Sequence, residues 1–175
     1  MRLIIATIIA TLIFSSCEQM KTTEKIEEDY SKYNVLIFLT DSCQVNSYYL
    51  PEVNRIAEQY KSEDELSFFA IYPSSELTSD EYMDLSGDTT VSFTRYYDQE
   101  MKLIDKYKVL VAPSAFIVDK QGKLLYGGAI DDKYASLTKP QIMASQRNLE
   151  DNLKALSSGS TLVYPSTPAV GCFIK

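Results

Sequence analysis

A continuous apolar run from Val35 to Leu39 (VLIFL) is the feature that most constrains how this chain can fold. A strand that faces water on one side alternates apolar and polar residues, whereas an unbroken run is typical of a strand that is covered on both faces. The run leads into a turn, Thr40–Cys43 (TDSC), and apolar residues then recur at helical spacing from Tyr49 to Tyr60. This segment therefore predicts a central strand, a turn that carries a cysteine, and a helix.

The rest of the chain continues to alternate strands and helices. Further strands are predicted over Leu66–Tyr72, Val91–Tyr97 and Ser114–Asp119, with a hairpin turn at Lys120–Gly122 and a return strand over Lys123–Tyr126. Helices are predicted over Ser79–Leu85, Glu100–Tyr107 and Pro140–Leu156, the last with Ile142, Leu149, Leu153 and Leu156 on its apolar side. This order of elements predicts an α/β sandwich.

The composition excludes several classes of function. The sequence has no histidine, which rules out Ser-His-Asp and Cys-His catalysis, histidine-ligated metals and haem with a proximal histidine. It has 17 Lys+Arg against 24 Asp+Glu, a net charge of −7, and no long basic run. Nucleic acid is therefore not an expected partner, because phosphate contacts need clustered cations.

The N-terminal residues indicate export from the cytoplasm. Leu3–Phe14 is apolar apart from two threonines, and it is shorter than the roughly 20 residues that cross a bilayer. A preceding Arg2 and following small residues are typical of a secretory signal peptide. The stretch Phe14–Cys17 (FSSC) resembles a bacterial lipobox, which implies cleavage after residue 16 and acylation of Cys17. An ordinary signal peptide with a stray cysteine is the alternative.

These features predict three regions along the chain. Residues 1–16 form a lipoprotein signal peptide, and residues 17–32, which are mostly charged and polar, form a lipid-anchored tether. Residues 33–175 form the folded domain. The expected location is the cell envelope, facing the periplasm or the surface, with the membrane contacted through the lipid on Cys17. Disulfides persist in such a compartment.

Cys43 is the first candidate for chemistry. It follows a buried strand and precedes a helix, where the free N–H groups and the helix dipole favour a thiolate, although Asp41 opposes this. Its place in a turn also predicts that it is exposed. A buried structural cysteine is the alternative.

The turn with Cys43, the following helix with Pro51, and the segment Val111–Lys123 (VAPSAFIVDKQGK) resemble the thioredoxin superfamily. The resemblance is closest to its redoxin and peroxiredoxin-like (AhpC/TSA) branch and covers residues 33–175. It implies a three-layer α/β/α sandwich with a C-terminal hairpin, helix and tail. It also implies that Pro113 is a cis-proline packed against the cysteine, and that the Ala112–Pro113 backbone binds a peptide.

The chain departs from the motifs of both thioredoxins and peroxiredoxins. Asn46 stands where thioredoxins carry the second cysteine of C-x-x-C, and we assign it with Ala112 and Pro113 to substrate binding. Thr40 lies three residues before Cys43, as in peroxiredoxins, but Leu36 occupies the position of their motif proline. The arginines that could polarise a peroxide, Arg55, Arg95 and Arg147, have no recognisable catalytic context.

The segment Thr167–Ile174 (TPAVGCFI) supplies a second thiol. It follows a flexible stretch, Ser157–Ser160, and resembles the tail of a subgroup of bacterial redoxin-domain proteins. Two cysteines in one secreted domain pair more often than they stay free. We therefore expect Cys172 to be the partner of Cys43, either as a resolving thiol or in a purely structural bridge. A Cys172 that stays unpaired is the third alternative.

The expected function is thiol–disulfide exchange outside the cytoplasm, in which Cys43 attacks and Cys172 resolves the mixed disulfide. One alternative is a peroxidase in which Thr40 orients the peroxide, and another is a non-catalytic binding module with a structural bridge. Protein thiols or disulfides, or a small peroxide, are the expected partners, without metal or cofactor. The pair Asp131 and Asp132 is expected to be solvated, and the tyrosines at 48, 49, 96 and 97 to belong mainly to the core and sheet.

Overall fold

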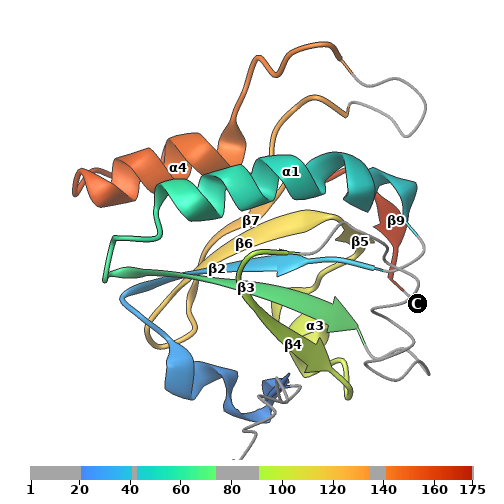
Figure 1. Ribbon diagram of the computed structural model, residues 1–175, viewed down its shortest axis with the longest axis vertical. Coiled ribbons are helices and arrows are strands. Elements are labelled where there is room, and N and C mark those ends of the chain that lie inside the picture. The colour runs from blue at the N-terminus through green and yellow to red at the C-terminus, as the bar shows by residue number, and fades with distance from the viewer. Residues whose placement is uncertain (1–20, 41–42, 74–90, 135–140, 175) are drawn as a thin grey trace, which may run out of the picture.

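The computed structural model describes residues 21–40, 43–73, 91–134 and 141–174. A seven-stranded sheet forms its centre (Figure 1). The strands lie in the order β1 (Lys21–Thr22), β4 (Thr94–Asp98), β3 (Leu66–Pro73), β2 (Tyr33–Phe38), β6 (Ser114–Asp119), β7 (Leu124–Gly128) and β8 (Ser166–Thr167). The first four are parallel, β6 and β7 are antiparallel to their preceding neighbours, and β8 is parallel to β7.

Helical elements cover both faces of the sheet. The helices α1 (Gln44–Gln59) and α4 (Asn148–Ser157) lie on one face, as Figure 1 shows. The short 3-10 helix η1 (Thr23–Asp29) and α3 (Lys102–Tyr107) pack on the other. The predicted three-layer α/β/α arrangement is confirmed. The helix predicted over residues 79–85 lies outside the described residues.

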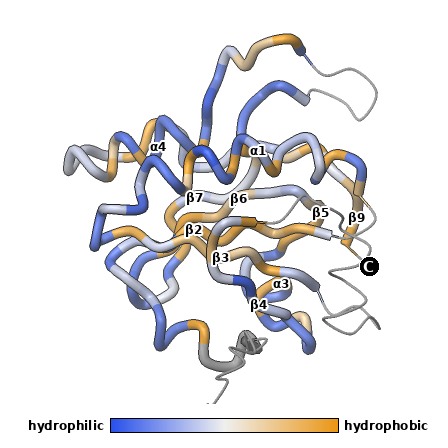
Figure 2. Tube along the Cα trace, in the orientation of Figure 1, coloured by the Kyte–Doolittle hydropathy of each residue, from blue (hydrophilic) through white to orange (hydrophobic). Residues whose placement is uncertain are grey.

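The apolar run in β2 faces both ways. Val35 and Ile37, with Leu39 beyond the strand, join the core under α1 and α4, whereas Leu36 and Phe38 join the core under η1 and α3. Successive side chains of a strand point to opposite faces, so one unbroken run supplies both cores. All five residues are at most 1% exposed. Figure 2 shows hydrophobic colouring along the central strands.

The hairpin between β6 and β7 is confirmed at the predicted turn. The carboxylate of Asp119 accepts hydrogen bonds from the backbone N–H groups of Gln121 and Lys123, each 2.9 Å long. Gly122 has a φ of +72°, a left-handed conformation that glycine adopts without a steric penalty. The turn therefore fixes the register that brings β7 back beside β6.

The last helix begins later than predicted. The sequence predicts a helix from Pro140, but α4 starts at Asn148, and Ile142, predicted on its apolar side, is 98% exposed. The reason lies in Asp132, whose carboxylate accepts a hydrogen bond of 2.8 Å from the N–H of Ser145. The backbone N–H of Asp132 also donates to the carbonyl of Gln146. These bonds hold residues 141–147 as a loop, because they occupy groups that a helix would use.

Part of the segment predicted as a tether, residues 17–32, packs against the folded domain. Ile26 and Tyr30 are buried against the core on the η1 side, at 1% and 6% exposure. Ile26 lies within η1, and Tyr30 directly follows it. The packed part of the chain therefore begins before Tyr33.

The second, two-stranded sheet consists of β5 (Val111–Ala112) and β9 (Cys172–Phe173).

None of the helices within the described ranges has the length and apolar composition that a membrane crossing requires.

Candidate functional site

The N-terminal end of α1 holds Cys43. The residue is the N-cap of the helix and follows the central strand β2 closely, as the sequence predicts. Its side chain is only 3% exposed, so the expectation of an exposed cysteine is wrong. The residue packs with the core under α1 and is joined to a distant part of the chain, residues 158–174, which we call the tail.

The tail is bonded covalently to the helix end. A disulfide joins Cys43 to Cys172 across 129 residues of sequence, with 5.8 Å between the two Cα atoms. The predicted pairing is therefore present in the structure. Cys172 is partly exposed, in contrast to its buried partner.

The tail also forms backbone pairs beside the bridge. Strand β9 runs antiparallel to β5, with Cys172 opposite Ala112 and Phe173 opposite Val111. The N–H of Ile174 extends this ladder by donating to the carbonyl of Leu110 at 3.1 Å. The backbone edge that the resemblance assigns to a bound peptide is thus occupied by the chain itself.

Ala112 and Pro113 lie next to the bridge. The Sγ of Cys43 is 3.4 Å from the carbonyl oxygen of Ala112, and the Ala112–Pro113 peptide bond is cis. A bridged sulfur carries no proton, so this approach is a packing contact in the disulfide form. It becomes a hydrogen bond only when the Cys43 thiol is free and protonated.

Thr40 and Asn46 lie together on the other side of Cys43. The amide nitrogen of Asn46 donates to the carbonyl oxygen of Thr40, which ties the first turn of α1 to the segment after β2. Within the described residues, Thr40 Oγ1, Asn46 Oδ1 and Ser114 Oγ are buried without a hydrogen-bond partner. Asn46 is only 6% exposed, so its amide faces the interior of the site.

An aromatic cluster of Tyr48, Tyr49 and Tyr134 lies further along the same helix, with ring centroids 4.9–5.7 Å apart. The hydroxyl of Tyr49 donates to Asp131 at 2.5 Å, and burial together with this bond raises the pKa of Tyr49. Asp131 is only 5% exposed, so the expectation that it is solvated is wrong. The signal in the sequence is a tyrosine on a buried helix face, whose hydroxyl needs a partner.

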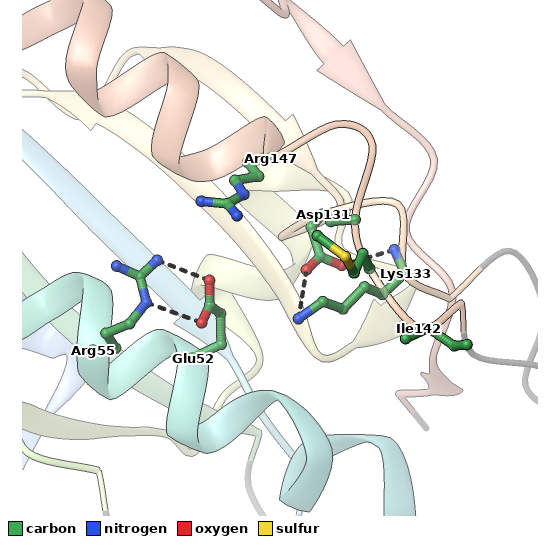
Figure 3. Close-up of a pocket in the computed structure, with 8 residues that line it drawn as sticks. Glu52, Arg55, Asp131, Lys133, Ile142 and Arg147 are labelled. Atoms are coloured by element: carbon green, nitrogen blue, oxygen red, sulfur yellow. Dashed lines mark hydrogen bonds and ion pairs between the residues drawn. The ribbon is translucent and has the colours of Figure 1, made fainter.

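A separate pocket of about 170 Å³ lies between α1 and the start of α4 (Figure 3). Arg55 contacts Glu52 at 2.8 Å and Glu150 at 3.1 Å. Figure 3 shows Lys133 directed toward Asp131, with a separation of 3.9 Å between the charged groups. Arg147 lies 3.5 Å from Glu150, so the cations lining the pocket each lie near a carboxylate. The lining residues include no cysteine. Across the described ranges, no three acidic or cysteine side chains gather as metal ligands do.

The three layers, the buried cysteine at the start of α1 and the adjacent proline segment define a protein of the thioredoxin-like fold class. Residues 15–126 match the model of the AhpC/TSA family. The chain belongs to the AhpC/TSA family, as the sequence resemblance implies. A comparison with curated proteins finds no match.

Solved structures support the fold. An uncharacterized conserved protein from Geobacillus kaustophilus is 23% identical, with a TM-score of 0.67 and coverage of 83% of this chain and 77% of that one. A putative thiol:disulfide interchange protein from Chlorobium tepidum is 20% identical, with a TM-score of 0.50 and coverage of 58% and 70%. The exposed lipoprotein thioredoxin of Streptococcus pneumoniae is 21% identical, with a TM-score of 0.50 and coverage of 58% and 77%. At these identities the likeness shows a shared fold.

Proposed function

We propose that this protein is a thiol–disulfide oxidoreductase that uses the Cys43–Cys172 pair. The observation that carries the proposal is the disulfide at the N-terminal end of α1, with one buried and one partly exposed cysteine. Family membership supports it, because the AhpC/TSA match includes Cys43. The names of the Chlorobium and pneumococcal neighbours, an interchange protein and a thioredoxin, support the same chemistry.

Reduction of a partner's disulfide takes two exchanges. The thiolate of Cys43 attacks one sulfur of the partner's disulfide, forms a mixed disulfide and expels the partner's other sulfur as a thiolate. The thiolate of Cys172 then attacks the Cys43 sulfur, which restores the internal bridge and releases the partner's second thiolate. The partner gains two electrons and two protons, and the Cys43–Cys172 dithiol loses them. The reverse sequence oxidises a partner dithiol.

The chain supplies two features for the first step. The free N–H groups of the first turn of α1 and the helix dipole stabilise a thiolate at Cys43. The Ala112–Pro113 backbone lies beside the reacting sulfur and offers an edge for an extended partner segment. Asn46 acts as a positioning residue, since its amide holds the Thr40 carbonyl rather than pointing to the surface.

A redox titration tests the proposal. The protein is equilibrated in buffers of graded potential, free thiols are alkylated, and intact mass reports the bridge. Exchangeable catalytic disulfides open near about −200 mV, whereas structural ones persist below about −300 mV. Opening near the higher value, with reduction of a protein disulfide lost in Cys43→Ser, supports the oxidoreductase. A bridge that persists below the lower value supports the non-catalytic binding module instead.

A peroxidase is the second candidate, and one observation favours it. Thr40 Oγ1 lies three residues before Cys43, buried and without a hydrogen-bond partner among the described residues. The arginines argue against it: Arg55 lies twelve residues after Cys43, which is about 18 Å along α1, and it pairs with Glu52 and Glu150. Peroxide consumption by the reduced protein, compared with that of Thr40→Val, tests this candidate. Slow consumption that Thr40→Val leaves unchanged contradicts it.

We also propose that the protein is exported and anchored through an acylated Cys17. The lipobox-like stretch Phe14–Cys17 supports this, and Cys17 lies outside the described residues. The pneumococcal neighbour is itself an exposed lipoprotein. The proposed regions are a signal peptide over 1–16, an anchored segment from 17 and the domain that follows. Intact mass of the protein from bacterial membranes, with and without Cys17→Ser, shows whether a lipid is attached.

A further inference from the structure

The tail strand sits on the site as a bound peptide does. Three consecutive positions, Cys172, Phe173 and Ile174, make backbone pairs with residues 110–112, and Cys172 is covalently joined to Cys43. Figure 1 shows β9 beside β5 at the end of the sheet where α1 begins. The geometry is that of an extended segment caught in a mixed disulfide, because both backbone register and sulfur position are defined.

The position before the cysteine accepts only glycine. Gly171 is buried, and a Cβ built on it would lie 2.2 Å from the carbonyl oxygen of Ala112 and 3.1 Å from the nitrogen of Pro113. Both are backbone atoms, so no side-chain movement relieves the contact. Any residue with a side chain at this position forces the strand away from the Ala112–Pro113 edge.

The positions after the cysteine differ from each other. Phe173 is 76% exposed, so the site places little restriction there. Ile174 is partly buried and packs against the core on the η1 and α3 side, next to Leu110, to which its N–H is bonded. The backbone edge of residues 110–112 therefore favours a segment with glycine before the cysteine, any residue directly after it, and an aliphatic residue at the next position.

We propose that the tail is an internal copy of the partner segment. The partner that exchanges with Cys43 is an extended polypeptide whose cysteine is preceded by glycine and followed, two residues later, by an aliphatic residue. This inference rests on the proposed thiol–disulfide exchange. The partner segment and the tail bind the same backbone edge, so the tail must leave before the partner's disulfide reaches Cys43.

The test uses the full chain carrying Cys17→Ser and Cys172→Ser, so that Cys43 is its one thiol. Peptides of sequence Ala-Val-Gly-Cys-Phe-Ile and Ala-Val-Ala-Cys-Phe-Ile are each supplied as a mixed disulfide with thionitrobenzoate. The Cys43 thiolate attacks the peptide sulfur, forms a Cys43–peptide disulfide and expels coloured thionitrobenzoate. Intact mass confirms which adduct forms. We expect the glycine peptide to react about ten-fold faster or more, since the added methyl group meets backbone atoms.

Two comparisons make the test specific. A third peptide, Ala-Val-Gly-Cys-Ser-Ile, changes the exposed position and is expected to react as fast as the first. Gly171→Ala in the same chain loosens the tail and is expected to speed up the glycine peptide, whereas Val170→Ala, a neighbouring tail substitution, leaves its rate nearly unchanged.

The outcomes separate the inference from the function on which it rests. Oxidised glutathione, which has no strand to bind, reports whether Cys43 exchanges at all. If Cys43 reacts with glutathione but treats the glycine and alanine peptides equally, the inference is wrong and the exchange function stands. If Cys43 reacts with none of the disulfides, the proposed function fails as well.

Discussion

The two cysteines of the bridge belong to very different parts of the molecule. Cys43 lies between the central strand β2 and the sixteen-residue helix α1, and it is buried with the main core. Cys172 lies near the end of the tail, in a two-residue strand of the two-stranded sheet. Cys43 lies within the main core, whereas Cys172 packs against that core from the tail and is paired through β9 and the disulfide.

The two cysteines are therefore suited to different roles in thiol exchange. Thiol exchange needs one sulfur in a constant position and one that can move away, because the mixed disulfide must replace the internal one. The helix end provides the first and the tail provides the second. The bridge therefore joins a rigid part and a displaceable part, and each can be altered separately.

Removing the bridge should have the largest effect. The loop that it closes spans 129 residues, so Cys172→Ser is expected to lower the free energy of unfolding by about 4–5 kcal/mol. Chemical denaturation in the absence of reductant measures this. Cys43→Ser should cost a similar amount if the bridge accounts for the effect. A much larger loss in Cys43→Ser alone would show that the buried side chain contributes separately.

A substitution in the rigid part should lower stability and leave the tail in place. Leu153 in α4 is fully buried, so Leu153→Ala is expected to cost about 2–5 kcal/mol. Ile142→Ala is the matched control, since Ile142 is 98% exposed and should cost less than about 0.5 kcal/mol. The midpoint potential of the bridge should be unchanged in both variants, and a shift in Leu153→Ala would contradict the separation of the two parts.

The rigid part also carries a pH-dependent contribution. Burial raises the pKa of Glu150, but Arg55 and Lys154 outweigh it, so the pKa lies below its ordinary value. A carboxylate with a lowered pKa stabilises the fold above its unfolded pKa, and this stability is lost as the pH falls below about 4.5. Glu150→Gln should therefore lower the free energy of unfolding by about 1 kcal/mol at pH 7 and change it little at pH 3.

Denaturation at both pH values measures the effect of Glu150→Gln. Glu58→Gln is its control, because Glu58 is well exposed and pairs with Lys61 at the surface. A loss in Glu150→Gln that is equal at the two pH values would indicate a packing effect rather than a charge effect.

Within the tail, the two residues after Cys172 should differ by a small amount. Ile174→Ala removes a partly buried side chain and should cost about 1 kcal/mol. Phe173→Ala removes an exposed ring and should change stability by less than about 0.5 kcal/mol. Denaturation of both variants checks the order, and a larger loss in Phe173→Ala would mean that its ring packs on the domain.

The sequence predicts the parts of the molecule whose pattern is local. The run Val35–Leu39 has an apolar residue at every position, so its burial on both faces of the sheet follows directly, as does the turn at Gly122. The start of α4 could not be predicted, because it depends on Asp132, thirteen residues before Ser145. The spacing of apolar residues over 140–147 gives no indication of the hydrogen bond between Ser145 and Asp132.

The site was predictable in its chemistry and only partly in its geometry. The place of Cys43 before a helix follows from the adjacent strand and helix patterns, whereas its bridge to a strand more than a hundred residues away depends on the folded chain. Gly171 has no distinguishing mark in the sequence, since its role comes from an approach to Ala112 that only the folded chain creates.

The distance along the chain between the two cysteines also orders events in time. A chain that is synthesised from its N-terminus presents Cys43 before Cys172, so the bridge between them cannot form until 129 further residues have followed. Strands β2, β3 and β6 can form their contacts in that interval, because they all precede the tail. The bridge can therefore first close only after nearly all of the domain has been synthesised.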